Sequence, residues 1–159
     1  MREKYEVAEA AIETVAEFVK YGNDVVRTRL VEVPNLLSSL VSLCGEEVLL
    51  RFSQPLVENI GRIAYNLSIS NPIRAVALME AGWANLLVRA LRARLHNEDA
   101  AYYVTWAIHT LLSDGPLICK ILFIAAGAKS TLKKTLKRHP TDNEVKRHCT
   151  HSLRILGDR

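Results

Sequence analysis

Hydrophobic residues recur along most of the chain at intervals of three or four positions. The clearest sets are Val57, Ile60, Ile63, Ala64 and Leu67 and, further on, Val104, Ala107, Ile108, Leu111 and Leu112. This spacing places apolar side chains on one face of a helix. The pattern therefore predicts long helices over residues 48–68 and 99–113, and a third over residues 143–156.

Two stretches between these helices repeat each other. Leu78 to Gly82 and Phe123 to Gly127 both precede leucines at helical spacing, and their glycines lie 45 residues apart. A period of that size is typical of α-helical repeat arrays. Each unit reads as a short helix, a glycine turn, a second helix and a long third helix. Glycine suits such a turn because a side chain there would clash.

The first unit carries a weaker version of the pattern. The segment from Leu30 to Pro34 stands where the glycine turns stand later, and Gly22 and Asn23 end the helix predicted over residues 7–21. Terminal repeats are often atypical because one of their faces has no neighbour. We expect one helical repeat domain over residues 1–159, with approximate units 1–47, 48–96 and 97–141 and a partial unit 142–159.

The repeated pattern resembles the armadillo repeat of importin-alpha and beta-catenin. The resemblance rests on the glycine turns and on the segments Ala64–Ser68, Glu80–Gly82 and Trp106–Thr110. It implies an all-α fold, a right-handed superhelix of stacked armadillo-type helix triplets whose third helices line a concave groove. A HEAT-like array of helix pairs has an overlapping period and is the alternative, although the two glycine turns favour the armadillo arrangement.

In peptide-binding armadillo proteins, the third helix presents a tryptophan and, four residues on, an asparagine that fixes the backbone of an extended peptide. This chain divides the pair: Asn66 follows Arg62, and Trp106 precedes Thr110. The divided pair and the basic body of the chain argue against a basic nuclear-import signal as the ligand. The same spacing predicts a groove face made of Glu58, Arg62, Asn66, Tyr102, Trp106, Thr110, Arg147 and His151.

The groove face combines an amide, two aromatic rings and two arginines. Such a surface suits a protein or peptide partner of acidic or apolar character. Each of its central residues also has a purely structural interpretation. Tyr102 and Trp106 are core residues in that alternative, and Asn66 forms a local hydrogen bond or caps a helix.

Charge is unevenly distributed within a net charge of +4. Residues 1–47 hold 5 basic and 9 acidic side chains, and residues 48–159 hold 16 basic and 8 acidic ones. Basic residues on the second helices predict an outer basic stripe of Arg89, Arg92, Lys129, Lys133, Lys134 and Lys137. The stripe is expected to meet an acidic partner or an anionic surface, or to be an ordinary solvated face. No aromatic residues are interleaved with it, so nucleic-acid binding is not expected.

Residue patterns for catalysis are missing from the sequence. It contains no glycine-rich phosphate loop, nucleophile elbow or convincing acid–base pair, so we expect no enzymatic activity, no cofactor and no small-molecule substrate. His148, Cys149 and His151 lack the spacing of known metal sites, and no metal is expected. Three widely spaced cysteines, with no apolar leader or membrane-spanning run, favour an intracellular protein, cytoplasmic or nuclear.

The expected function is therefore a non-enzymatic scaffold that binds a peptide or partner helix in a concave groove. Two alternatives depend on charge. Opposite charge at the two ends of the chain suits a structural segment that associates with itself or within a larger assembly. The basic stripe suits an adaptor for anionic surfaces.

Overall fold

The structure is a computed structural model that describes residues 2–45 and 53–158. Within these ranges it consists of ten helices without any strand. The helices are α1 (Arg2–Tyr21), α2 (Asp24–Glu32), α3 (Leu36–Leu43), α5 (Gln54–Ser68), α6 (Pro72–Glu80), α7 (Trp83–Ala93), α8 (Glu98–Asp114), α9 (Leu117–Ala125), α10 (Ala128–Arg138) and α11 (Asn143–Ile155). The part of the predicted third helix at 48–52 lies outside the described residues.

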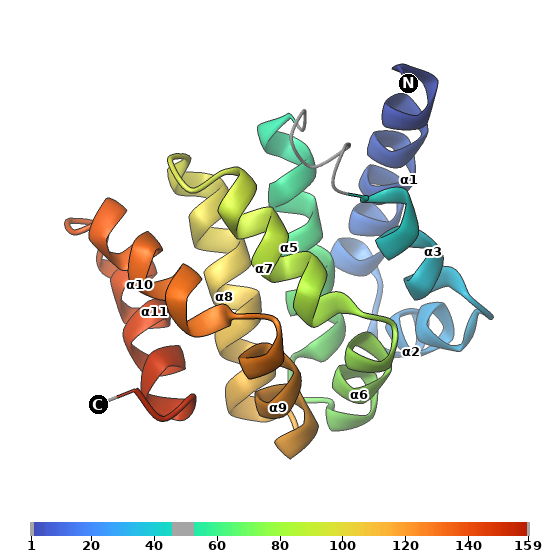
Figure 1. The fold of residues 1–159 in the computed structure, drawn as a ribbon. Coiled ribbons are helices and arrows are strands. Elements are labelled where there is room, and N and C mark those ends of the chain that lie inside the picture. The colour runs from blue at the N-terminus through green and yellow to red at the C-terminus, as the bar shows by residue number, and fades with distance from the viewer. Residues whose placement is uncertain (1, 46–52, 159) are drawn as a thin grey trace.

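Three helix triplets follow one another across the molecule, preceded by α1 (Figure 1). Each triplet has a short first helix, a second helix and a long third helix: α2, α3, α5; then α6, α7, α8; then α9, α10, α11. Counterparts in successive triplets pack on each other, α5 on α8 and α8 on α11, α6 on α9, and α7 on α10. The fold is thus an all-α solenoid. The predicted unit limits at 96/97 and 141/142 fall between second and third helices.

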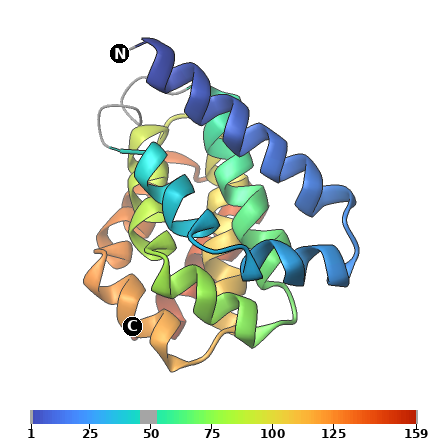
Figure 2. The ribbon, with the colours of Figure 1, turned by 90° about the vertical axis from the view of Figure 1, so that its right-hand side faces the viewer.

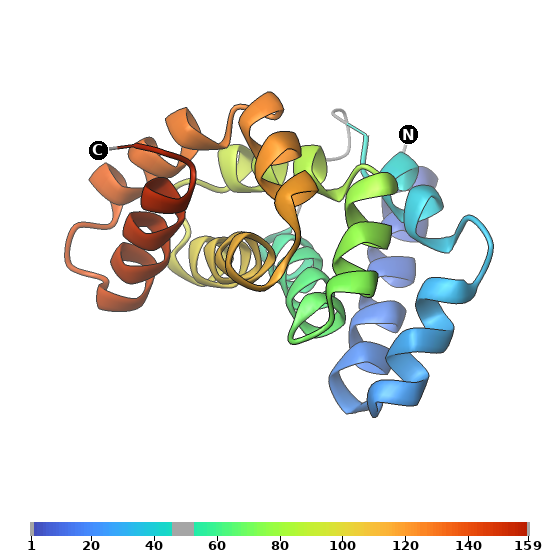
Figure 3. The ribbon, with the colours of Figure 1, turned by 90° about the horizontal axis from the view of Figure 1, so that it is seen from below.

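The N-terminal helix α1 takes the place of a third helix from a preceding unit. It packs on α5, as α5 packs on α8. Figure 2 looks onto the N-terminal side and shows α1 lying beside the triplet that begins with α2. Figure 3 shows the layers: α7 and α10 lie on one side of the array, and α8 and α11 on the other.

A residue in the left-handed conformation joins the first and second helix of every triplet. Gly82 has φ of 89° and Gly127 has φ of 77°, which confirms the predicted glycine turns. In the first triplet this place is held by Asn35, with φ of 60°. Asparagine is among the few residues besides glycine that tolerate this region. A Cβ at 127 would lie 2.8 Å from Nη2 of Arg92, which is the end of a flexible side chain, so the positive φ is the main reason for glycine there.

Polar side chains begin four of the helices. The side chains of Asn23, Asn71 and Asn97 each accept a hydrogen bond from a backbone N–H three residues ahead, and Asp142 accepts from two. These bonds satisfy N–H groups that the first helical turn leaves without partners. The caps lie at the starts of first and third helices, so they help to define where these helices begin.

Two arginines tie successive units together. Nε of Arg27 donates to the carbonyl of Val19 at 3.0 Å, and Nε of Arg74 donates to the carbonyl of Leu67 at 2.6 Å. Each guanidinium thereby binds the end of the preceding long helix, where carbonyls lack helical partners. Arg74 is 2% exposed and also forms an ion pair with Asp24 at 2.7 Å. This bond links α6 to α2.

The core lies between the layers and sets how closely the third helices approach. Trp83 is fully buried, and its indole N–H donates to the carbonyl of Leu37 at 3.2 Å. Gly61 lets α5 lie against α8, because a Cβ at 61 would be 2.7 Å from the backbone of Tyr103. None of the described helices is long and apolar enough to cross a membrane.

Candidate functional site

The third helices present the surface on which most of the predicted site residues lie. Helix α8 is covered by α5, α11, α7 and α9, which leaves one strip uncovered. Along this strip lie the half-buried rings of Tyr102, Trp106 and His109 and the exposed Ser113. We call the exposed surface of α5, α8 and α11 the third-helix face.

A continuous series of rings crosses this face. Tyr65 on α5 lies 3.9 Å from Trp106, centroid to centroid, and Trp106 stacks on His148 of α11 at 6.1 Å with 7° between the planes. His148 is 5.5 Å from His109, which is 5.5 Å from His151. The ring row therefore consists of Tyr65, Tyr102, Trp106, His109, His148 and His151.

Burial keeps the centre of the ring row uncharged. Burial, followed by the nearby His109 and Arg147, lowers the pKa of His148 to about 4. The pKa of His109 is lowered by burial and then by His151. Burial raises the pKa of Tyr65. These groups are therefore neutral near pH 7. The partly exposed rings of Tyr65, Trp106 and His109 offer uncharged π surface, whereas His148 is buried.

Charged and amide groups surround the α5 end of the row. The amide nitrogen of Asn66 donates to the carbonyl of Arg62 at 2.8 Å, and Arg27 donates to its oxygen at 3.4 Å. The Arg62 guanidinium lies 4.3 Å from the centroid of the Tyr103 ring and 3.7 Å from the Glu58 carboxylate. The amide of Asn66 is thus engaged locally, as the structural alternative for this residue expected.

The structure distributes the predicted groove residues over three environments. Tyr102, Trp106 and His151 belong to the ring row, and the two aromatic residues are half-buried, partly core and partly surface. Arg147 lies on α11 and pairs with Glu144. Thr110 is only 6% exposed, because neighbouring helices cover it, so it packs in the interior and offers a partner almost no surface.

Sequence reasoning missed three members of the ring row. Tyr65 follows the predicted Arg62 by three positions, His109 follows Trp106 by three, and His148 precedes His151 by three. Neighbours at an interval of three lie on the same side of a helix. That interval was the available signal, whereas the predicted groove face rested on the interval of four.

Half of the predicted basic stripe forms bonds within the protein. Arg92 donates to the Thr131 hydroxyl at 2.9 Å and to the carbonyls of Ala126 and Gly127 at 3.4 Å. Arg89 donates to the carbonyl of Cys44 at 3.4 Å. Lys133 pairs with Asp158 at 2.7 Å, and Lys129 is half-buried. Lys134 and Lys137 are exposed on α10, as are Arg92 and Lys133.

The cysteines and the C-terminal histidines give no sign of metal binding in the part of the chain that the structure describes. No group of three or more His, Cys, Asp or Glu residues there is arranged to hold a metal ion. Cys44, Cys119 and Cys149 are free and buried. Burial raises the pKa of Cys149 to about 12, so its thiol is protonated.

No protein-family model matches the chain, and neither does any curated protein. Among solved structures, one engineered protein is similar with a TM-score of 0.58 and 21% identity, over 91% of this chain and 62% of its own. A second engineered protein has a TM-score of 0.57 and 21% identity, over 92% of this chain and 37% of its own.

A designed armadillo repeat protein, solved in complex with the peptide (KR)4, is also similar. Its TM-score is 0.55 and its identity 21%, over 89% of this chain and 62% of its own. This chain therefore spans less than two thirds of the length of each of these proteins. At this identity the similarity shows the fold alone, which is that of α-helical repeat proteins. It confirms the predicted fold class.

Proposed function

We propose that this chain is an armadillo-type scaffold, without enzymatic activity, that binds a segment of a partner protein on its third-helix face. The observation that carries the proposal is the ring row, which crosses α5, α8 and α11 without a break. Left-handed turns in every triplet and the likeness to a designed armadillo protein support the armadillo assignment. Three buried free thiols among the described residues support an intracellular location.

The chemistry of the face favours a partner with apolar or aromatic side chains and some acidic ones. Aromatic pairs contribute about 0.5–1.5 kcal/mol beyond their buried area, so several rings in series can hold an extended segment. Arg62 on α5 and Arg147 on α11 lie on the two third helices that flank α8, and they supply guanidinium groups for carboxylates. Glu58 and Glu144 pair with these arginines, so the carboxylates of an acidic partner would replace the glutamates in these ion pairs.

A peptide library displayed on phage tests this function while the natural partner is still unidentified. We expect selected peptides to be enriched in aromatic, aliphatic and acidic residues. Trp106→Ala is expected to weaken their binding at least about tenfold, as truncation of a central interface tryptophan usually does. Binding would be measured by titration calorimetry, and folding by circular dichroism.

The matched control is Tyr21→Ala. Tyr21 is an aromatic residue of α1 that is 73% exposed and lies outside the third-helix face. Its truncation is expected to leave peptide affinity unchanged. Equal affinity of the folded Trp106→Ala variant and the wild type would refute the proposed site.

A further inference from the structure

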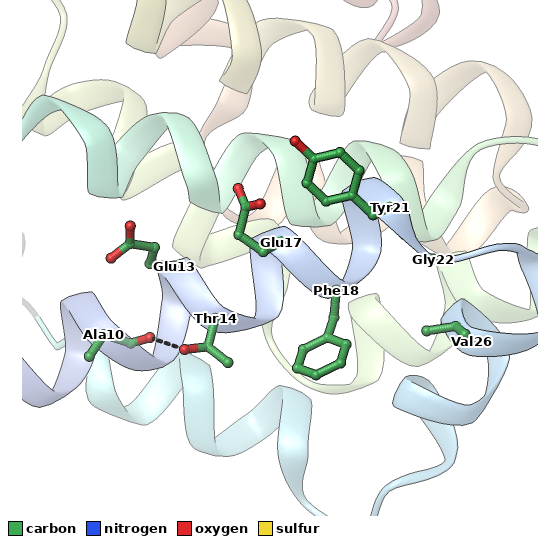
Figure 4. A pocket seen from close by; sticks show the side chains of 8 residues that line it. All are labelled: Ala10, Glu13, Thr14, Glu17, Phe18, Tyr21, Gly22 and Val26. Atoms are coloured by element: carbon green, nitrogen blue, oxygen red, sulfur yellow. Dashed lines mark hydrogen bonds between the residues drawn. The ribbon is translucent and has the colours of Figure 1, made fainter.

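The N-terminal end of the solenoid is an acidic surface with exposed apolar residues. An open hollow of about 670 Å³ lies along α1 and reaches α2 (Figure 4). Glu13 and Glu17 line it together with Phe18 and Tyr21, which are 58% and 73% exposed. Val25 on α2 is 66% exposed. We call the exposed surface of α1 and α2 the N-terminal end face.

The C-terminal end is a basic surface that also exposes apolar residues. Leu117, Ile121 and Ile124 are 69%, 51% and 45% exposed and follow one another along one side of α9. On α11, Lys146 and Arg154 are exposed, whereas Val145, Cys149 and Leu153 are buried on its other side. We call the exposed surface of α9 and α11 the C-terminal end face.

The internal stacking of the solenoid shows how these two faces would meet. Within the chain, third helices pack on third helices in the order α1, α5, α8, α11, and first helices in the order α2, α6, α9. One further step in the same order places α11 of one copy on α1 of the next. No described first helix of the second copy then lies beside α9, because α2 belongs to the repeat after α1.

The chemistry of α11 and α1 is complementary. Lys146 and Arg154 of α11 would face Glu13 and Glu17 of α1. The net charges of the two end regions are opposite in sign: residues 1–47 hold 5 basic and 9 acidic side chains, and residues 117–159 hold 10 basic and 3 acidic ones. Fields of opposite sign steer such surfaces together.

We propose that the N-terminal end face binds the C-terminal end face of a second copy of this chain, so that copies stack head to tail. The contact joins two different surfaces. A stack of any length therefore still exposes one N-terminal end face and one C-terminal end face, at its two ends. The packing of third helix on third helix continues across the junction. The third-helix face stays accessible along the whole stack.

Sedimentation velocity over a wide concentration range tests the stacking with two charge-reversal variants. Glu13→Lys with Glu17→Lys makes the N-terminal end face basic, and Lys146→Glu with Arg154→Glu makes the C-terminal end face acidic. All four positions are exposed, so the fold should be kept. Each variant alone is expected to associate at least about tenfold more weakly than the wild type, because like charges then meet.

An equimolar mixture of the two variants should associate again. The unchanged basic face of the first then meets the unchanged acidic face of the second, and the two reversed faces also match. Glu80→Lys with Glu98→Lys is the control, because both positions are exposed outside the end faces, and it should associate like the wild type.

Salt and a substitution on the third-helix face separate this stacking from other contacts. High salt should weaken association of the wild type, because the junction joins opposite charges, whereas Trp106→Ala should leave association unchanged. A wild type that stays monomeric at every concentration would overturn the proposal. So would reversal variants that associate like the wild type, a mixture that does not recover, or loss of association in Trp106→Ala.

Discussion

The second-helix side and the third-helix side of this solenoid use their large polar and aromatic side chains in different ways. On α7, Arg89 and Arg92 direct their guanidinium groups to backbone carbonyls of adjacent units. On α8, Tyr102 and Trp106 contact rings of the adjacent units and remain partly exposed. Both sides link the repeats, but the second-helix side does so through hydrogen bonds and the third-helix side through ring contacts.

This difference shows how a repeat stack separates stability from recognition. A guanidinium that reaches a carbonyl uses its donors within the protein, so a partner would have to replace those bonds. A ring that stacks on its neighbour is held in place while its edge and part of its face stay in contact with solvent. Each of the following changes tests one side of this comparison.

Acidification should have the largest effect, through His148 on the third-helix side. The pKa of His148 is about 4 in the folded chain, against an ordinary value of 6.5. Between these values the unfolded chain binds more protons, so the free energy of unfolding falls as pH decreases from about 6.5 toward 4. We expect a loss of about 2 kcal/mol, since His148 is 1% exposed and the Glu144 carboxylate 3.9 Å away offsets part of the cost of charging it.

Urea denaturation at a series of pH values measures this loss. His148→Phe should flatten the pH dependence over the same interval. His96→Phe is the matched control, because His96 is exposed, and it should keep the wild-type dependence. A wild-type stability that does not change over this interval would contradict the burial of a neutral imidazole in the ring row.

Removal of Arg92 on the second-helix side should have an intermediate effect. Arg92→Ala removes the bonds to Thr131 and to the carbonyls of Ala126 and Gly127. We expect the free energy of unfolding to fall by about 1 kcal/mol, with peptide binding on the third-helix face unchanged. Urea denaturation and titration calorimetry measure the two quantities. Lys134→Ala, at an exposed position of α10, should change neither. Weaker peptide binding in Arg92→Ala would show that the second-helix side also contributes to recognition.

Asn35→Gly should have the smallest effect and should be stabilising. Asn35 holds φ of 60° in the turn where the later triplets have Gly82 and Gly127. Glycine adopts this conformation without the strain of a Cβ, although it gains more entropy on unfolding. We expect an increase of about 0.5 kcal/mol in the free energy of unfolding, measured as a higher midpoint in thermal denaturation. A lower midpoint would show that the asparagine side chain contributes to the turn.

Sequence alone predicted the features that depend on local periodicity. The spacing of Gly82 and Gly127 predicted the triplets and their turns, and apolar spacing predicted the third helices. Asn35 was missed as a turn residue because the turn requires a positive φ. Asparagine adopts a positive φ less often than glycine, so it is a weaker signal of such a turn in a sequence.

The interactions between units could not be predicted in the same way. The stacking of Tyr65 on Trp106 depends on how closely α5 and α8 approach, which Gly61 permits through its missing side chain. The reach of Arg92 to carbonyls 34 and 35 residues away depends on the stacking of second helices. Spacing within one helix indicates which side a residue occupies, and it does not indicate which neighbour its side chain will contact.

Acrylamide quenching of tryptophan fluorescence tests the central claim most directly. Trp106 is half-exposed in the ring row, whereas Trp83 is fully buried, so Trp106 accounts for the quenchable emission. A selected peptide should protect this emission from acrylamide in the wild type. In Trp106→Phe, where only Trp83 emits, the peptide should cause no change. Saturating peptide binding that leaves wild-type quenching unchanged would show that the partner binds elsewhere.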